Sequence, residues 1–267
     1  AQAMNNGTTP TGCTLGLIGR PLGHSYSKVF FDTLFERENR SESYGLFELP
    51  ELTPATLYTL LLMNPCLRGF NVTAPYKEAI VPMLDYMDSV AQAVGAVNTV
   101  SVRRADDGRV LALDGYNTDV AGFTGAIAPV LGEARPGALI LGTGGASKAA
   151  AVAFDRLGID FLKVSRTPSG NNIGYSDIDA ALLERYPLVV NATPAGTWPD
   201  VDTAPPFPVH LLGPANICFD MVYNPSPSLW LRQSEERGAR IRSGLDMLYL
   251  QALAALEIWD GNLLNSL

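Results

Sequence analysis

The sequence predicts an α/β fold arranged as two domains. Short apolar runs of strand length alternate with stretches of helical spacing, a pattern typical of βαβ units and parallel sheets. The length of 267 residues corresponds to about 1.8 domains of roughly 150 residues each. A hydrophobic content of 47% with 17% charged residues supplies enough apolar surface for a core, so a disordered chain is excluded.

The expected elements follow from these patterns in chain order. Apolar runs predict strands at 14–18, 44–49, 69–73, 97–102, 138–141, 161–164, 188–191 and 217–222, and helical spacing predicts helices at 28–38, 119–131, 146–157 and 245–258. A turn signal at 114–117, followed by the helix from 119, predicts a domain boundary. We therefore expect one domain at 1–118, completed by the C-terminal segment 244–267, and a second at 119–243.

Charge and composition narrow the class of partner. The chain has 27 acidic and 19 basic residues and a formal charge of -8, which disfavours nucleic acid or an anionic membrane as a partner. No apolar run approaches the roughly 18 residues of a membrane span, so we expect a soluble, cytoplasmic protein. The cysteines and histidines are too scattered to indicate a disulfide framework or a metal site. They are Cys13, Cys66, Cys218, His24 and His210. The first ten residues lack a signal-peptide pattern and are expected to be a flexible leader.

The segment 138–147 has the order of a dinucleotide-binding motif, which is a strand, a glycine-rich turn and a helix. Glycines permit the sharp turn and the close approach of a phosphate, while the N–H groups at the start of the helix attract the anion. Ser147 takes the place of the third glycine as another small residue. The motif predicts a Rossmann-type domain that binds the cofactor through Gly142, Thr143, Gly144, Gly145 and Ala146, with an ordinary structural turn as the alternative.

The end of the next strand favours NADP(H) over NAD. NAD-selective sites place an acidic residue about 20 residues after the glycine turn, where it accepts from the ribose hydroxyls. Here the strand ends in Ser165, Arg166 and Thr167. The guanidinium of Arg166 can pair with a 2′-phosphate, and an exposed, solvated arginine is the alternative.

Seven further motifs occur in order along the chain, with the glycine turn between the fourth and the fifth. They are GRPLGHSYS at 19–27, GFNVTAPYK at 69–77, GAVNT at 95–99, GYNTD at 115–119, NATPAG at 191–196, DMVYNP at 220–225 and GLDMLYLQA at 244–252. On these motifs the sequence resembles the shikimate dehydrogenase family from about residue 14 to 262. The resemblance implies reversible NADPH-dependent reduction of 3-dehydroshikimate to shikimate, on the route to chorismate and the aromatic amino acids, in a cleft between two domains.

The resemblance also implies a substrate site that contains neutral polar side chains. Ser25 and Ser27 are expected to alternate on one side of an extended segment, so that two hydroxyls converge on the substrate carboxylate. The groups expected around the ring hydroxyls are Thr73, Asn98, Tyr223 and Gln251, together with Lys77 and Asp119. For any single one of these residues, an ordinary turn or capping role is the alternative.

Lys77 and Asp119 are the expected catalytic pair. Hydride transfer to a ketone leaves an alkoxide that needs a proton, and a lysine ammonium held near a carboxylate can donate it. The resemblance implies that Lys77 is the acid and base and that Asp119 holds it in place. The alternative for Lys77 is a solvated lysine on a helix, and the alternative for Asp119 is a helix N-cap. His24 is left out of the catalytic set because the family uses it structurally. Met221 and Gly244 match positions at the nicotinamide end of the cofactor.

Two departures from the family pattern leave alternatives open. Lys28 follows Ser27 where proline is frequent, and the loop 168–172 lacks the second basic residue that the family often carries, which weakens the NADP preference. The rivals are a quinate or aminoshikimate dehydrogenase relative using NAD or NADP, and a non-catalytic NADPH-binding sensor. Either a monomer or a homodimer fits the sequence, and domain closure on the ligands is expected.

Overall fold

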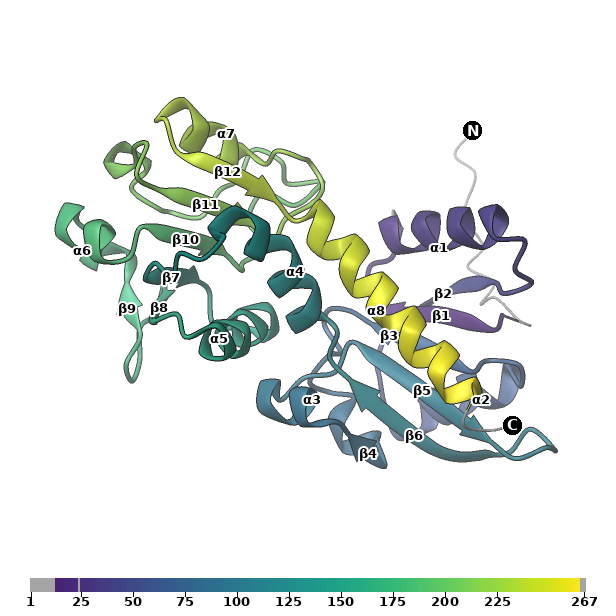
Figure 1. The fold of residues 1–267 in the computed structure, drawn as a ribbon. Helices are drawn as coiled ribbons and strands as arrows, with labels where there is room; N and C mark the ends of the chain where they lie inside the picture. The colour runs from purple at the N-terminus through teal and green to yellow at the C-terminus, as the bar shows by residue number, and fades with distance from the viewer. Residues whose placement is uncertain (1–12, 24, 265–267) are drawn as a thin grey trace, which may run out of the picture. The chain divides into compact units, whose positions relative to one another are not determined.

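The computed structural model describes residues 13–23 and 25–264, with side chains up to 261. The predicted leader and His24 lie outside the described residues. The chain forms two compact units, one of them the described residues up to Thr118 together with those from Ala255 onward, and the other Asp119–Ala254. Both units are α/β (Figure 1), which confirms the predicted fold class.

The first unit is built on a six-stranded sheet in the order β2-β1-β3-β5-β6-β4. Its elements are β1 (Leu15–Gly19), α1 (Tyr26–Arg37), β2 (Tyr44–Glu48), α2 (Pro54–Met63), β3 (Gly69–Val72), the 3₁₀ turn η1 (Val81–Met83), β4 (Tyr86–Met87), α3 (Ser89–Val94), β5 (Thr99–Arg104) and β6 (Val110–Tyr116). The pairs β1–β2, β1–β3 and β4–β6 are parallel, whereas β5 runs antiparallel to β3 and to β6.

The turn predicted at 114–117 is wrong, because its first three residues end strand β6. Asp114 is held in the strand by Arg103 of β5, whose Nε donates to Asp114 Oδ2 over 2.7 Å. A Cβ on Gly115 would lie 2.5 Å from a methyl carbon of Leu84 and 3.0 Å from one of Val97. Glycine therefore stands here because the sheet is closely covered, and not because the chain turns.

Helices cover both faces of this sheet. The apolar faces of α2 and α3 pack on one side, in a cluster that includes Leu57, Leu60, Phe70 and Ala91. On the other side Phe31 of α1 stacks on Tyr44, with ring centroids 4.6 Å apart, and also contacts Trp259 of α8 (Leu245–Leu264). The C-terminal part of α8 is thus part of the core of the first unit.

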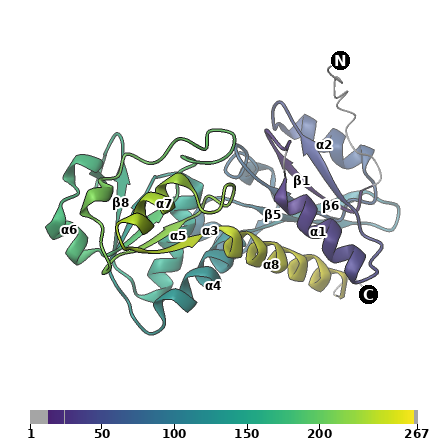
Figure 2. The ribbon, with the colours of Figure 1, turned by 90° about the horizontal axis from the view of Figure 1, so that it is seen from above.

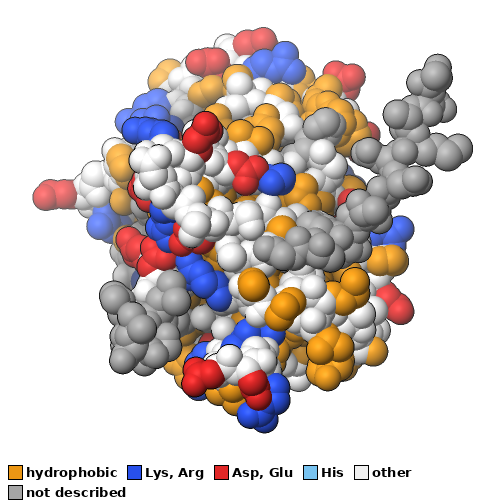
Figure 3. Space-filling view, turned by 90° about the vertical axis from the view of Figure 1, so that its right-hand side faces the viewer, with side chains coloured by type: hydrophobic (Ala, Val, Ile, Leu, Met, Phe, Trp, Pro, Cys, Tyr) orange, Lys and Arg blue, Asp and Glu red, His pale blue; other side chains and the backbone are white. Residues whose placement is uncertain are grey.

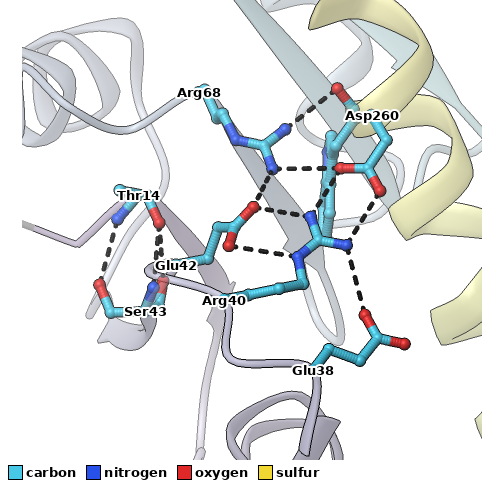
Figure 4. A network of polar contacts seen from close by, with 8 residues as sticks. Thr14, Glu38, Arg40, Glu42, Ser43, Arg68 and Asp260 are labelled. Atoms are coloured by element: carbon cyan, nitrogen blue, oxygen red, sulfur yellow. Dashed lines mark hydrogen bonds and ion pairs between the residues drawn. The ribbon is translucent and has the colours of Figure 1, made fainter. Parts of the chain in front are cut away.

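A polar network fixes the end of α8 to the first unit (Figure 4). Arg40, Glu42, Arg68 and Asp260 point toward one another, with Arg40 donating to Glu42 Oε1 over 2.6 Å and to Asp260 Oδ1 over 2.8 Å. Arg68 contacts the same two carboxylates and donates to the carbonyl of Trp259 over 3.0 Å. The hydrogen bond from Arg40 lowers the pKa of Glu42 to about 2, so Glu42 is ionised at neutral pH.

Replacing Asp260 with alanine should lower the free energy of unfolding by about 1 kcal/mol, because it removes a two-bond contact with Arg40 from a partly exposed network. Urea titration of the variant measures this loss. Asp32→Ala is the matched control, since among the described residues Asp32 pairs only with Lys28, its neighbour one turn away on the exposed surface of α1. Equal unfolding free energies for the two variants would contradict a stabilising role for the network.

The second unit has a fully parallel six-stranded sheet in the order β12-β11-β10-β7-β8-β9. Its elements are α4 (Asp119–Leu131), β7 (Ala138–Leu141), α5 (Gly145–Leu157), β8 (Phe161–Ser165), β9 (Ile173–Gly174), η2 (Tyr175–Asp177), α6 (Ala180–Arg185), β10 (Leu188–Asn191), η3 (Val209–Leu211), β11 (Ile217–Asp220), α7 (Leu229–Glu236), β12 (Arg240–Ser243) and the first part of α8. Counted from the β9 edge to the β12 edge, the strands follow the 3-2-1-4-5-6 order of dinucleotide-binding domains.

Helices lie on both faces of this sheet as well (Figures 1 and 2). Leu183 of α6 and Trp230 of α7 pack on one face with Leu139 and Val189. On the other face, Phe123 of α4 meets Phe154 of α5 edge-on at 5.4 Å. In such a sheet, ligands bind beyond the carboxyl ends of the strands where the strand order reverses, which is here between β7 and β10.

Helix α8 is shared between the two units, with the division at Ala254 and Ala255, whereas the sequence analysis assigned all of 244–267 to the first domain. Its first part packs closely on α4, since a Cβ on Gly122 would lie 2.7 Å from the carbonyl oxygen of Met247 and 2.9 Å from Cβ of Gln251. This helix contact explains why the beginning of α8 belongs with α4.

Among residues 13–23 and 25–264, no helix combines the length and the apolar character needed to cross a membrane. On the face drawn in Figure 3, acidic and basic side chains are interspersed with hydrophobic ones, and the described residues show no broad basic area there.

Candidate active site

The glycine turn lies at the carboxyl end of β7, where α5 begins. Gly142 has a φ of 107°, a left-handed conformation that favours glycine. A Cβ at this position would also lie 3.0 Å from Cγ2 of Thr193, which follows β10. Gly142 therefore allows the turn to sit closely against the neighbouring strand end.

The start of α5 has room for a phosphate group. Gly144 is its N-cap and no side chain caps the first turn, which leaves N–H groups of that turn for an anion. A Cβ on Gly144 or Gly145 would meet nothing within 4 Å. Ser147 is fully buried, and its hydroxyl has no hydrogen-bond partner among the described residues. The open, uncapped turn fits the pyrophosphate of a dinucleotide.

A buried carboxylate, which the sequence analysis missed, joins the loops at this edge of the sheet. Asp220 ends β11 and is 0% exposed. Its Oδ1 accepts from Asn191 Nδ2 over 3.0 Å and from the Val222 N–H over 2.9 Å, and its Oδ2 accepts from Ser228 Oγ over 2.5 Å. Asn191 Oδ1 in turn accepts from the N–H of Thr193 over 3.0 Å. Asp220 thus links the end of β10, the segment after β11 and the N-cap of α7, and the loop after β10 lies against the glycine turn at Thr193.

Burial raises the pKa of Asp220 to about 6, against the lowering effect of its three hydrogen bonds. The signal available in the sequence was an acidic residue that follows the apolar run 217–219 and opens the motif DMVYNP. Its partners come from positions 29 residues earlier and 8 residues later, so the network exists only in the folded sheet.

Met221 and Gly244 are brought together at the same edge. A Cβ on Gly244 would overlap the carbonyl oxygen of Met221, and the Gly244 N–H donates to the carbonyl of Val222 over 3.3 Å. The Met221 N–H donates to the carbonyl of Asn191 over 3.0 Å. Gly244 is therefore required by a close approach of backbones beside the strand ends.

The end of β8 carries the residues predicted for the ribose. Ser165 Oγ accepts from the N–H of Thr167 over 3.2 Å and holds a tight turn. Arg166 between them is exposed, and within the described part of the chain it forms no ion pair. The guanidinium is accordingly available to a ligand.

In the first unit, the two predicted serines differ in local structure. Ser25 is the N-cap of α1 and accepts from the Lys28 N–H over 3.2 Å, whereas Ser27 lies inside the first turn of the helix. The expectation of an alternating extended segment is therefore wrong, because the cap formed by Ser25 starts the helix at Tyr26. Lys28 is engaged locally, with its ammonium 2.8 Å from Asp32 and 2.9 Å from the carbonyl of Tyr44.

Asn98 belongs to a buried polar network. Its Nδ2 donates to Thr118 Oγ1 over 2.8 Å, and its Oδ1 accepts from the Thr118 N–H over 2.7 Å and from Thr99 Oγ1 over 3.1 Å. Asn71 Nδ2 donates to the carbonyl of Asn98 over 3.2 Å. These bonds fix both the orientation of the Asn98 amide and the backbone that leads directly into Asp119.

Thr73 and Lys77 flank one turn after β3. The Thr73 N–H donates to the carbonyl of Ile18 over 2.9 Å, and its carbonyl accepts from the Tyr76 N–H over 3.0 Å. The carbonyl of Lys77 accepts from the Val97 N–H over 2.8 Å. The half-buried Lys77 thus lies in an anchored turn outside any helix, which removes the alternative of a solvated helix lysine.

The remaining predicted residues belong to the second unit. Asp119 is the first residue of α4 and is 8% exposed. Gln251 of α8 packs against Gly122, one turn further along α4, and its Nε2 donates to the carbonyl of Leu248 over 2.9 Å. Tyr223 follows β11 and is half-buried. Gln251 and Asp119 therefore belong to neighbouring turns of two packed helices.

Comparison with known proteins identifies the family. Residues 17–100 match the family model described as the shikimate dehydrogenase substrate binding domain. The NADP(+) shikimate dehydrogenase of Desulforamulus reducens is 32% identical, over 92% of this chain and 89% of that protein. The chain belongs to the shikimate dehydrogenase family. The corresponding protein of Moorella thermoacetica is 36% identical over 92% of this chain and 88% of its own length.

Solved structures of family members share the fold. Shikimate 5-dehydrogenase from Thermus thermophilus, in complex with NADP(H) and shikimate, superimposes with a TM-score of 0.80 at 30% identity and covers 93% of this chain and 94% of that one. Quinate dehydrogenase from Corynebacterium glutamicum, in complex with NAD, gives a TM-score of 0.77 at 25% identity, with 94% and 95% coverage. Structures of this fold therefore include one in complex with NADP(H) and one in complex with NAD.

Proposed function

We propose that this protein catalyses the reversible NADPH-dependent reduction of 3-dehydroshikimate to shikimate. The observation that carries the proposal is membership of the family at 32–36% identity over most of the chain, together with an open dinucleotide turn and the Lys77, Asp119 and Gln251 set. The product would supply the route to chorismate and the aromatic amino acids. A cytoplasmic location, and a monomer or homodimer, complete the proposal.

The second unit is the proposed cofactor domain. Bound NADPH supplies the hydride. The turn from Gly142 to Ala146 would hold the pyrophosphate at the start of α5, and Arg166, with Ser165 and Thr167, would bind the 2′-phosphate. Met221 and Gly244 would border the nicotinamide. The uncapped first turn of α5 and the exposed guanidinium of Arg166 support this assignment.

Lys77 is the proposed acid and base. In the direction of reduction, its ammonium donates a proton to the oxygen that becomes the new hydroxyl, and in oxidation the neutral amine takes that proton back. Asp119 would orient the lysine and would accept a hydrogen bond from a substrate hydroxyl. The anchored turn around Lys77 supports its role, because a proton donor must be held in position.

The first unit is the proposed substrate domain. Ser25 and Ser27 would bind the carboxylate, aided by the start of helix α1, since a helix N-terminus favours an anion. The ring hydroxyls would be bound by Thr73, Asn98, Tyr223 and Gln251. The fixed amide of Asn98 supports a role in selecting one arrangement of hydroxyls.

A second candidate is quinate dehydrogenation with NAD. It is favoured by the likeness to a quinate dehydrogenase structure in complex with NAD and by the absence of a basic residue at 168–172. Arg166 at the end of β8, where an NAD enzyme has an acidic residue, favours NADP.

Steady-state assays of dehydrogenation with shikimate or quinate, each with NADP+ or NAD+, test the proposal. We expect the largest kcat/KM for shikimate with NADP+. For shikimate, kcat/KM with NADP+ should exceed that with NAD+ by about tenfold or more, because a charge-assisted contact with the 2′-phosphate contributes roughly 1.5–3 kcal/mol. A larger kcat/KM for quinate with NAD+ would transfer the assignment to the second candidate.

A further inference from the structure

Lys163 is a half-buried lysine in the middle of β8, close to the proposed cofactor site. Phe161, two residues earlier and so on the same face of the strand, packs against Phe154 of α5 with ring centroids 6.1 Å apart. The side chain of Lys163 therefore projects to the α5 side of the sheet. Its Cα lies two residues, roughly 7 Å, before the end of the strand, a distance that a lysine stem can largely span.

Lys163 has no acidic partner among the described residues. Burial, and the charge of Lys148 in the first turn of α5, lower the pKa of the Lys163 ammonium. The chain has four lysines in all. Two of them are neighbours here, and no carboxylate among the described residues pairs with Lys163. Half-buried like charges are unfavourable unless an anion joins them.

The end of β8 is where a dinucleotide places the 2′ position of its adenosine ribose. Arg166 is at that end, and the loop that follows it has no second basic residue. A basic group approaching from the α5 side would supply the charge that this loop lacks.

We propose that Lys163 is a cofactor-specificity residue, which, together with Lys148 and Arg166, forms a basic site for the 2′-phosphate of NADP(H). The inference rests on the proposed use of NADP and adds to it the residues that make the choice over NAD. A doubly charged phosphate between these cations neutralises the unfavourable pair, so the phosphate itself completes the site.

Calorimetric titration with adenosine 2′,5′-bisphosphate and with adenosine 5′-monophosphate tests the inference without turnover. Lys163→Met should weaken binding of the bisphosphate by about tenfold or more, the loss of one charge-assisted contact, and change monophosphate affinity less than about twofold. Lys163→Arg should retain bisphosphate binding because it keeps the charge. Arg156→Gln, at the other end of α5, is the matched control and should bind both ligands as the parent protein does.

Lys163→Met should also be at least as stable to urea as the parent, because it removes a partly desolvated charge beside Lys148. Loss of binding will then not be confused with loss of folding. Unchanged bisphosphate affinity in Lys163→Met, or an equal loss for both ligands, would overturn the assignment. A parent protein that binds the two ligands equally would instead overturn the proposed use of NADP, and this inference with it.

Discussion

Lys77→Ala should lower kcat for shikimate oxidation by about 10²- to 10⁴-fold, the range expected for losing a positioned general acid and base. The half-buried turn that holds Lys77 is anchored by its own backbone, through the Val97 N–H, and by the Thr73 to Tyr76 hydrogen bond. Removing the side chain should therefore leave the fold and the binding of shikimate and NADP+ largely intact. Steady-state kinetics and equilibrium titration together measure the two effects.

Lys28→Ala is the matched control, since it removes an ammonium from the same unit. Lys28 is paired with Asp32 on the surface of α1 and has no place in the proposed proton transfer. Its kcat should stay within about twofold of the parent value. Near-normal turnover in Lys77→Ala would contradict the assignment of Lys77 as the acid and base.

Asp220→Ala should lower the free energy of unfolding by about 3–5 kcal/mol, because it leaves three donors in the interior of the second unit without their acceptor. Those donors, on Asn191, Val222 and Ser228, also hold the loops beside the glycine turn. Affinity for NADP+ should fall along with stability. Asp220→Asn keeps one acceptor oxygen and should lose markedly less of both, and equal losses in the two variants would contradict this account of the network.

The same carboxylate predicts a pH dependence. Burial raises the pKa of Asp220 to about 6 from an ordinary value of 3.8, so between these values the native state holds a proton that the unfolded state has released. The contribution of Asp220 to stability is therefore fully present below about pH 4 and is lost as the pH rises through 6, by up to about 3 kcal/mol. The difference in unfolding free energy between the parent and Asp220→Asn should favour the parent more at pH 4.5 than at pH 7. A pH-independent difference would contradict the raised pKa.

The cofactor domain could be predicted from the sequence in most of its elements, because its signals are local. The buried parallel strands β7 and β10 are continuous apolar runs, and the glycine turn stands next to the helix that it starts. The edge strand β12 was missed, since Arg240 and Arg242 alternate with Ile241 and give no apolar run. Its parallel pairing with β11 makes it a strand, which its composition does not indicate.

The parts of the candidate site that the sequence could not predict depend on contacts between distant segments. The Asp220 network joins residues from β10, β11 and the N-cap of α7, and the Asn98 network joins residues about 20 positions apart. The spacing of Ser25 and Ser27 predicts an extended segment, whereas the cap formed by Ser25 starts a helix at Tyr26 and places Ser27 in its first turn. In the sequence Lys163 has only the features of a strand residue. The structure shows that its side chain lies on the same side of the sheet as Lys148.

Incubating the purified protein with NADPH and 3-dehydroshikimate tests the central claim most directly. NADPH absorbance should fall with the formation of one shikimate for each NADPH consumed, shikimate being quantified by chromatography and mass spectrometry, and Lys77→Ala should show neither change on the same timescale. NADPH binding without any shikimate formed would contradict the claim, and would favour a protein that senses the cofactor without turning it over.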